Sequence, residues 1–236
     1  MTEPTITKRA SPNRDTRPPG AKIAHVILHY TGMLTGGMAL RRLCDPKAKG
    51  SAHYLIARNG AITQLVEESM RAWHAGQSYW RGAVGLNDTS IGVELVNRGH
   101  EWGYQQYPAR QIEACAVLVR DIMRRHNIPP QNILGHSDIA PARKTDPGEY
   151  FPWRELARQG VGVWIDDVPD SPESAPINGV EVREFLRRIG YDCPPDCGDE
   201  TLRQCLLAFQ RHWYQDNLTG VADAGTVARL RVYARL

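Results

Sequence analysis

The sequence lacks several features that would place it in a specialised class of protein. No apolar run approaches the roughly 18 residues that a membrane-spanning helix requires. The polar N-terminus contains no apolar core of the kind found in a signal peptide. Lysine and arginine do not gather in runs with interleaved aromatic residues, so the net charge of +3 gives no case for nucleic-acid binding. These absences, with 42% hydrophobic and 23% charged residues, favour an ordinary globular protein.

Cysteine is scarce and odd in number. Five cysteines without a signal peptide argue against a disulfide scaffold. Cys193, Cys197 and Cys205 lie near the C-terminus. A second zinc site built from these three cysteines and His212 is disfavoured, because the seven-residue separation of Cys205 and His212 corresponds to about 10 Å along a helix. Buried free thiols or one local disulfide are the expected states.

The length of 236 residues and the changes in composition predict one main domain followed by a small one. We expect a flexible arm over residues 1–21 and the main domain over residues 22–165. Acids, serine and proline predominate over residues 166–177, which predicts a linker. Three helical patterns follow over residues 178–236, each with an Asp or Asn near its start as an N-cap.

The main domain is predicted to have an α/β fold, a mixed central sheet flanked by helices. KIAHVILHYT and IGVELVN are continuous apolar runs typical of buried strands, and His25, Ile27 and His29 share one face of the first. Asn59-Gly60 between two alternating runs predicts a hairpin. The stretch from Gln111 to Ile128 has apolar residues at helical spacing, which predicts an amphipathic helix over the sheet.

Polar groups concentrate in GHSDIAPARKTDPGEYFPW, residues 135–153. His136 begins this loop after a short predicted strand, Asp146 lies within it, and His29 ends another strand. Two imidazoles and one carboxylate are the ligand set of an open catalytic zinc ion, whose bound water has a pKa of ~7. A histidine in an apolar strand is more often a packed core residue than a metal ligand. Spacing alone therefore does not decide which residues form the ligand set. The competing residues are His25, His53, His74 and Asp138.

Glu94 and Lys144 are the other unusual charges. Glu94 is the only charge in an apolar strand, and burial can tune a carboxylate towards service as a general base. The alternative is an edge strand in which Glu94 faces solvent. Lys144 precedes Asp146 and could stabilise an oxyanion. The alternative for Lys144 is a surface side chain or an ion pair with Asp146 or Glu149.

Five segments extend the argument beyond spacing: VILHYT, SAHYLI, RAWHAG, NDTSIGVELVN and the loop at residues 135–153. In this order they closely resemble the type 2 N-acetylmuramoyl-L-alanine amidases of the AmpD/AmiD kind, over roughly residues 20 to 165. Phage lysozyme-amidases and peptidoglycan recognition proteins are more distant relatives. The resemblance implies zinc-dependent hydrolysis of the amide between the lactyl group of N-acetylmuramic acid and L-alanine of the stem peptide, with 1,6-anhydro-muropeptides as further substrates.

Matching motifs imply a role for each site residue. The zinc ligands would be His29, His136 and Asp146, Glu94 the catalytic acid and base, and Lys144 the group that stabilises the transition state. The distant relatives with activity have cysteine as the last ligand, so Asp146 points to the AmpD/AmiD branch.

Three further residues receive supporting roles. His74 in the WHAG motif is expected to line the cleft as a substrate contact. His53 is expected to be structural, and Asp138 to support the ligands indirectly.

The segment TLRQCLLAFQRHWYQDNLTGVADAGTVARL resembles a three-helix peptidoglycan-binding domain. The implied partner is peptidoglycan or a muropeptide. Such a domain points to the periplasm, whereas a missing signal peptide points to the cytoplasm; non-classical export or removal of a leader would reconcile the two. The rival functions are a non-catalytic peptidoglycan receptor, which would lack a complete ligand set, and a glycosidase, which would need a second carboxylate opposite Glu94.

Overall fold

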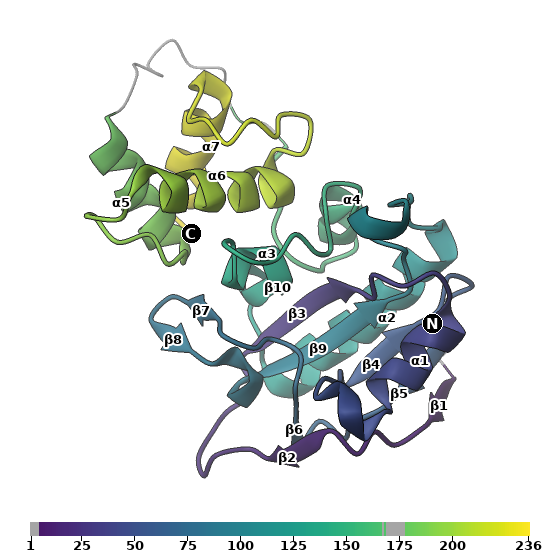
Figure 1. The fold of residues 1–236 in the computed structure, drawn as a ribbon. Helices are drawn as coiled ribbons and strands as arrows, with labels where there is room; N and C mark the ends of the chain where they lie inside the picture. Colours follow the sequence, from purple (N-terminus) through teal and green to yellow (C-terminus); the bar gives the residue numbers. More distant parts are fainter. Residues whose placement is uncertain (1–4, 167, 169–177) are drawn as a thin grey trace.

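A mixed six-stranded sheet forms the centre of the computed structural model, which describes residues 5–166, 168 and 178–236 (Figure 1). Its strands, in spatial order, are β1 (Ile6–Lys8), β5 (Ile62–Gln64), β4 (Tyr54–Ile56), β9 (Ser90–Leu95), β3 (His25–Tyr30) and β10 (Ile133–Gly135). Only β4 and β5 pair antiparallel; the other neighbours are parallel. The predicted mixed sheet with flanking helices is confirmed, and Asn59-Gly60 turns the β4–β5 hairpin, with Gly60 at φ +87.

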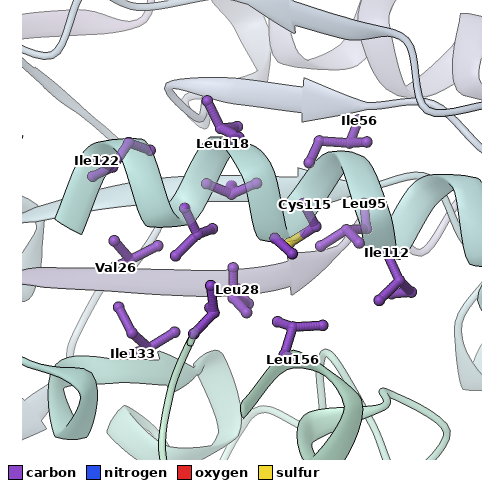
Figure 2. Packing of buried hydrophobic residues seen from close by; sticks show 14 of the residues in the cluster. Val26, Leu28, Ile56, Leu95, Ile112, Cys115, Leu118, Ile122, Ile133 and Leu156 are labelled. Carbon is purple, nitrogen blue, oxygen red and sulfur yellow. The ribbon is translucent and has the colours of Figure 1, made fainter. Parts of the chain in front are cut away.

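The two faces of the sheet are covered differently. Val26 and Leu28 of β3 point to α2 (Ala109–His126), whose apolar stripe forms the largest buried cluster with them (Figure 2). The opposite face carries Ile27 and His29. Helix α1 (Gly36–Leu43) packs on this second face near β4, where Leu55 and Val96 are buried. Because side chains alternate along each strand, one face of the sheet is packed against α2 and the opposite face is available for a functional site.

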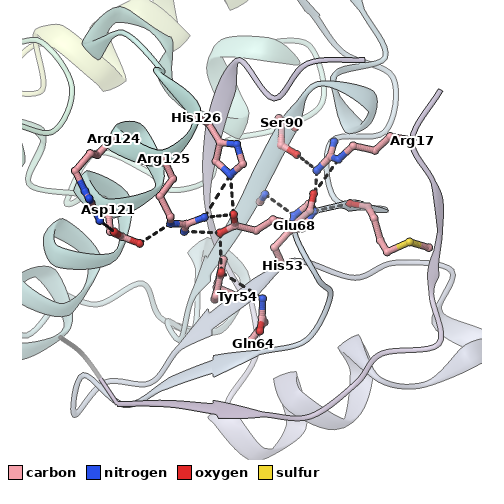
Figure 3. A network of polar contacts seen from close by, with 12 residues as sticks. Arg17, His53, Tyr54, Gln64, Glu68, Ser90, Asp121, Arg124, Arg125 and His126 are labelled. Carbon is pink, nitrogen blue, oxygen red and sulfur yellow. Dashed lines mark hydrogen bonds and ion pairs between the residues drawn. The ribbon is translucent and has the colours of Figure 1, made fainter. Parts of the chain in front are cut away.

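Residues 5–21 do not form the flexible arm that their polar, proline-rich composition predicts. Strand β1 pairs with β5 at the sheet edge, and β2 (Arg14–Thr16) pairs with β6 (Met70–Ala72). Arg17 donates to the backbone carbonyls of Glu68 and Ser90 (Figure 3). It also donates to the carbonyls of Asn87 and Asp88. Backbone pairing and one guanidinium hold this segment in place, and neither leaves a hydrophobic signal in the sequence.

Glu68 is the centre of a polar network that joins α2 to the turn after β5 (Figure 3). Its carboxylate accepts hydrogen bonds from Arg125 at 2.8 Å, His126 at 2.7 Å and the Tyr54 hydroxyl at 2.7 Å. Burial alone would raise the pKa of Glu68, but these donors favour the charged form and lower the pKa to about 2. The network therefore depends on an ionised Glu68.

Short elements connect the sheet to the site. They are β7 (Tyr79–Trp80), β8 (Ala83–Val84), α3 (His136–Ile139), α4 (Trp153–Arg158) and the single-turn 3-10 helices Pro46–Ala48, Leu86–Asp88, His100–Trp102 and Pro130–Asn132. Over the ranges that the structure describes, no helix combines the length and apolarity needed to cross a membrane.

Three helices make up the C-terminal part: α5 (Gly179–Ile189), α6 (Asp199–Trp213) and α7 (Ala224–Tyr233). Asn178 and Asp223 accept hydrogen bonds from the first-turn amides of α5 and α7, as predicted for N-caps, whereas Gly198 occupies that position in α6. Of the linker expected over residues 166–177, all but Asp166 and Val168 lies outside the described residues.

The C-terminal helices share a core with the main domain. One buried cluster joins Ile27, Leu134 and Ile139 to side chains of α5, α6 and α7, and Figure 1 shows α3 between the sheet and these helices. The five cysteines are free; the Sγ atoms of Cys193 and Cys197 lie 3.7 Å apart.

Candidate active site

Three side chains that are distant in sequence meet at the carboxyl ends of β3 and β10. His29 comes from β3, His136 follows β10 directly, and Asp146 lies in the loop beyond α3. The His29 Nδ1, His136 Nδ1 and Asp146 Oδ2 atoms lie 3.0 Å from one another. All three residues are buried, and among the described residues they form the one group of this kind that could hold a metal ion.

The loop that carries Asp146 is fixed by hydrogen bonds at both sides. The Ser137 amide donates to the Asp146 carbonyl at 2.9 Å. The hydroxyls of Tyr104 and Tyr107 donate to the Pro147 carbonyl at 2.6 and 2.8 Å. The third ligand position is therefore set by backbone contacts before any ion binds.

The contacts of His136 fit the tautomer that carries its proton on Nε2. Its other ring nitrogen, Nε2, lies 3.2 Å from the Ala75 carbonyl, which can only accept a hydrogen bond. A proton on Nε2 suits this contact, and in that tautomer the Nδ1 lone pair is directed at Asp146 and His29.

The same assignment for His29 depends on a chain of donors. The Ser90 hydroxyl donates to the Leu86 carbonyl at 2.5 Å, so it accepts from His74 Nε2 at 3.2 Å. His74 Nδ1 then accepts from His29 Nε2 at 3.1 Å. His29 Nδ1 consequently faces the site as a lone pair. Burial is the main cause that lowers the pKa of His74 well below its usual value, so His74 is neutral as the chain requires.

In these tautomers three acceptor atoms converge, and they repel one another unless a cation, either a proton or a metal ion, lies between them. Neighbouring ligands in a tetrahedral site with bonds of about 2.0 to 2.2 Å lie roughly 3.3 to 3.5 Å apart. The observed 3.0 Å separations are close to this spacing. Two imidazole nitrogens and one carboxylate oxygen also match the donor set of catalytic zinc sites, so the residues fit the ion.

His74 is positioned by a glycine in the neighbouring strand. A Cβ atom added to Gly92 would lie 2.4 Å from the His74 ring, so the imidazole can rest on β9 only because this residue has no side chain. His74 lines the cleft, but both of its ring nitrogens are already bonded to His29 and Ser90. The hydrogen bond from His29 gives His74 a second role, which is to orient the His29 ring, and the substrate contact stays a prediction.

Glu94 lies beside His29 in the centre of the sheet. The parallel pairing of β3 and β9 places the two residues opposite one another, and β4 flanks β9 on its other side. The alternative of an edge strand is therefore excluded. Glu94 Oε2 is buried, with no hydrogen-bond partner among the described residues. Burial, followed by the charge of Asp146, raises the pKa of Glu94 well above its usual value, and Lys144 opposes this shift.

A cavity of about 590 Å³ brings the predicted site residues together. Glu94 and Lys144 line it with His29, His136 and Asp146, and its rim includes Trp73, Arg98 and Glu101. Lys144 is half-buried and has no ion pair with Asp146 or Glu149 within the described residues. The cleft thus combines a ligand set, one carboxylate of raised pKa and one cation.

Histidines outside the set have other partners. His53 is fully buried and accepts from the Gly92 amide at 3.0 Å, consistent with its predicted structural role. His25 lies at the opposite end of β3, beside Thr89.

Asp138 connects the site to the C-terminal helices. Its carboxylate accepts from the Gly135 amide, the Tyr191 hydroxyl and His212 Nδ1, each at 2.7 Å. The first bond fixes the start of α3 at His136. The His212 ring also stacks on Trp153, with 3.7 Å between centroids. The sequence indicated that Asp138 supports the ligands but not that the helical part supplies its partners.

Several contributors were missed by sequence reasoning. Ser90 and Leu86 direct the proton of His74, and Arg143 donates to the Ala75 carbonyl at 2.6 Å beside His136. A glycine inside an apolar strand is a signal of close approach, so Gly92 could have indicated that a ring packs there.

Comparisons with known proteins agree with this geometry. Residues 19–149 match the family model described as N-acetylmuramoyl-L-alanine amidase. The amidase AmiD of Escherichia coli is 40% identical over 225 residues, which cover 88% of this chain and 80% of AmiD. The 1,6-anhydro-N-acetylmuramyl-L-alanine amidase AmpD of Haemophilus influenzae is 37% identical over 161 residues, which cover 61% of this chain and 85% of AmpD.

Solved structures resemble both parts of the chain. Escherichia coli AmiD in complex with anhydro-N-acetylmuramic acid-L-Ala-D-gamma-Glu-L-Lys superposes with a TM-score of 0.82 at 38% identity, covering 93% of this chain and 92% of that one. AmpDh3 of Pseudomonas aeruginosa gives a TM-score of 0.84 at 34% identity, with coverage of 93% and 94%.

Proposed function

The chain belongs to the N-acetylmuramoyl-L-alanine amidase family, and from that premise we propose that it hydrolyses the amide between the lactyl group of N-acetylmuramic acid and L-alanine of the stem peptide. Soluble 1,6-anhydro-muropeptides are among its substrates in this proposal, because AmiD has been crystallised with such a compound and the AmpD relatives are named for it. The observation that carries the proposal is the convergence of His29, His136 and Asp146 beside Glu94 in one cavity.

The ion we propose for the site is zinc, held by His29 Nδ1, His136 Nδ1 and Asp146. When bound, zinc supplies a Lewis acid that polarises the scissile carbonyl and lowers the pKa of water. Its charge also relieves the repulsion among the three converging acceptors.

Glu94 moves the protons in the proposed mechanism. Its carboxylate accepts a proton from the water that attacks the carbonyl carbon, and burial, which raises its pKa, makes it a stronger base for this step. The resulting acid donates the proton to the nitrogen of alanine as the amide bond breaks. A single carboxylate in a buried strand can serve as base and then acid because its position does not change between the steps.

Lys144 stabilises the negative charge that develops on the carbonyl oxygen. It lines the same cavity and, within the part of the chain that the structure describes, no carboxylate neutralises it. A charged donor already in place acts at the moment of reaction without reorganisation.

The C-terminal helices are proposed to bind peptidoglycan. Support comes from the resemblance of residues 201–230 to peptidoglycan-binding helices and from the AmiD match, which extends over 88% of the chain. The non-catalytic receptor finds no support, since every residue needed for hydrolysis meets in one cleft.

Glu94→Gln tests the mechanism. The release of free stem peptide from an anhydro-muropeptide, measured by mass spectrometry, should fall by about 10²- to 10⁴-fold, the usual contribution of a general acid–base. The zinc content should equal that of wild type, and Glu101→Gln, which changes another carboxylate of the cavity, should retain activity. A Glu94→Gln rate within a few fold of wild type rejects the role of Glu94. Chelation should abolish turnover and zinc should restore it; indifference to chelator rejects the metal.

A further inference from the structure

Two consecutive residues, His74 and Ala75, contact both imidazoles of the proposed metal site. His74 Nδ1 lies 3.1 Å from Nε2 of His29, and the Ala75 carbonyl oxygen lies 3.2 Å from Nε2 of His136. A hydrogen-bond partner on the ring nitrogen that faces away from the ion fixes the orientation of a metal-binding histidine. The position of this dipeptide therefore decides how well the two ligand nitrogens converge.

The dipeptide is held by the turn at residues 86–90, which leads into β9. The side-chain oxygen of Asn87 accepts hydrogen bonds from the His74 amide at 2.9 Å and from the Ala75 amide at 2.7 Å. Ser90 Oγ lies 3.2 Å from Nε2 of His74. Because the Asn87 oxygen binds both amides at once, a shift of this turn moves His74 and Ala75 together.

Arg17 fixes the turn from the side remote from the cleft. Its guanidinium donates to the Ser90 carbonyl at 2.9 Å and to the Glu68 carbonyl at 3.0 Å (Figure 3). It also donates to the carbonyls of Asn87 at 3.1 Å and Asp88 at 2.8 Å. A planar fork of five N–H groups can bind several carbonyl oxygens at once, which no other side chain can do. One guanidinium thus supplies the donors for most of this turn.

The segment that carries Arg17 also pairs with the strand that leads to His74. Strand β2 pairs antiparallel with β6, which ends two residues before His74. Arg71 of β6 forms ion pairs with Asp15 at 3.1 Å and with Asp88 at 3.0 Å. The N-terminal segment therefore joins the approach to His74 to the turn before β9, and it holds the two at a fixed separation.

We propose that Arg17 and Asn87 are positioning residues of the metal site, where Arg17 holds the turn at residues 86–90 and Asn87 transmits its position to residues 74 and 75. The inference rests on the proposed function, since it concerns the ion proposed there. Neither residue lines the catalytic cleft, so both act through the ligands and not on the substrate. Loss of their bonds lets the ligand nitrogens drift apart, which weakens metal binding.

Arg17→Met tests this role, because it removes the donors and keeps an aliphatic stem. Zinc affinity, measured in competition with a chelator, should fall about 10- to 100-fold, the usual effect of losing a group that orients a ligand. Arg17→Lys keeps the charge without the planar fork, so its affinity should lie between those of wild type and Arg17→Met.

Arg120→Met is the matched control. Arg120 is also half-buried and donates to a backbone carbonyl, that of Gln159 at 2.6 Å, but it has no contact with the turn at residues 86–90. Its zinc affinity should equal that of wild type, and urea denaturation of the metal-free proteins gives the stability of each variant. An equal fall in zinc affinity for Arg17→Met and Arg120→Met overturns the positioning role, because general destabilisation would then explain both.

Two variants of Asn87 test the second step of the argument. Asn87→Asp keeps an oxygen acceptor for the amides of residues 74 and 75, whereas Asn87→Ala removes it. We expect the zinc affinity of Asn87→Ala to fall about 10- to 100-fold and that of Asn87→Asp to equal that of wild type. With cobalt(II) in place of zinc, the visible absorption spectrum should change in Asn87→Ala and Arg17→Met only. Loss of affinity in both Asn87 variants, or in neither, overturns the proposal.

The failure of each proposal has its own signature. Wild-type protein that binds no zinc refutes the metal in the proposed function. Wild-type protein that binds zinc, with the same affinity in Arg17→Met and Asn87→Ala, overturns the positioning role alone.

Discussion

Asp138→Ala tests how strongly the helical part supports the site. The substitution removes a buried carboxylate that accepts three hydrogen bonds of 2.7 Å, from Gly135, Tyr191 and His212. Each donor left without a partner costs about 1–3 kcal/mol, and the three costs do not add in full. These values overlap because the bonds share one carboxylate. We expect a loss of about 3–5 kcal/mol in the free energy of unfolding.

Urea denaturation of the full chain measures this loss, and Asp196→Ala, which changes an exposed acid of the helical part, should be near wild type. In a double-mutant cycle with His212→Ala, the coupling energy should be about 1–3 kcal/mol, since the two residues contact directly. Zinc affinity should also fall, because Asp138 fixes the start of α3 at His136. Additive losses, or a separate unfolding transition for the helices in wild type, would refute the view that Asp138 joins the two parts.

Three further predictions concern single side chains. His74→Ala is expected to lower zinc affinity about 10- to 100-fold, measured in competition with a chelator, because this is the usual effect of removing a group that orients a ligand. Ser90→Ala should also lower zinc affinity. Unchanged affinity in both variants contradicts the proton assignment. Lys144→Gln should reduce turnover by about 10²-fold with normal zinc content. Arg98→Gln, at the rim of the cavity, should leave turnover unchanged. A rise in KM without a fall in kcat for Lys144→Gln contradicts the oxyanion role. Glu68→Gln should destabilise the protein most above about pH 5. Since the pKa of Glu68 is lowered from 4.5 to about 2, its contribution to stability is lost as the pH falls through that interval. A difference in unfolding free energy between variant and wild type that does not change with pH contradicts this prediction.

Sequence reasoning succeeded where a residue stands out from its local pattern. His29 and Glu94 interrupt apolar runs, so the sheet and these two residues could be predicted, whereas their position side by side depends on the register between β3 and β9. The choice of His136 and Asp146 over competing residues depended on the family resemblance, because a loop has no period from which side-chain direction follows.

The contacts that sequence reasoning missed are tertiary. Arg17 binds four carbonyl groups, and a carbonyl is present in every residue, so no pattern identifies its partners. The bond between Asp138 and His212 joins residues separated by 74 positions, and its existence depends on how the helices dock. The low apolar content of residues 5–21 predicted a flexible arm, because apolar content indicates only whether side chains are buried. This segment is instead held by backbone hydrogen bonds in β1 and β2.

The core shared between the sheet and the C-terminal helices has a consequence for how such proteins diverge. Ile27 of β3 and Leu186 of α5 belong to one buried cluster, and Asp138 has its partners on the helical side. A mutation of His212 on α6 is therefore exposed to selection for catalysis even though this side chain does not line the catalytic cleft. In related genes we expect Asp138 and His212 to be replaced together, and exchange of the helical segment between relatives to succeed only when its partner surface is transferred with it.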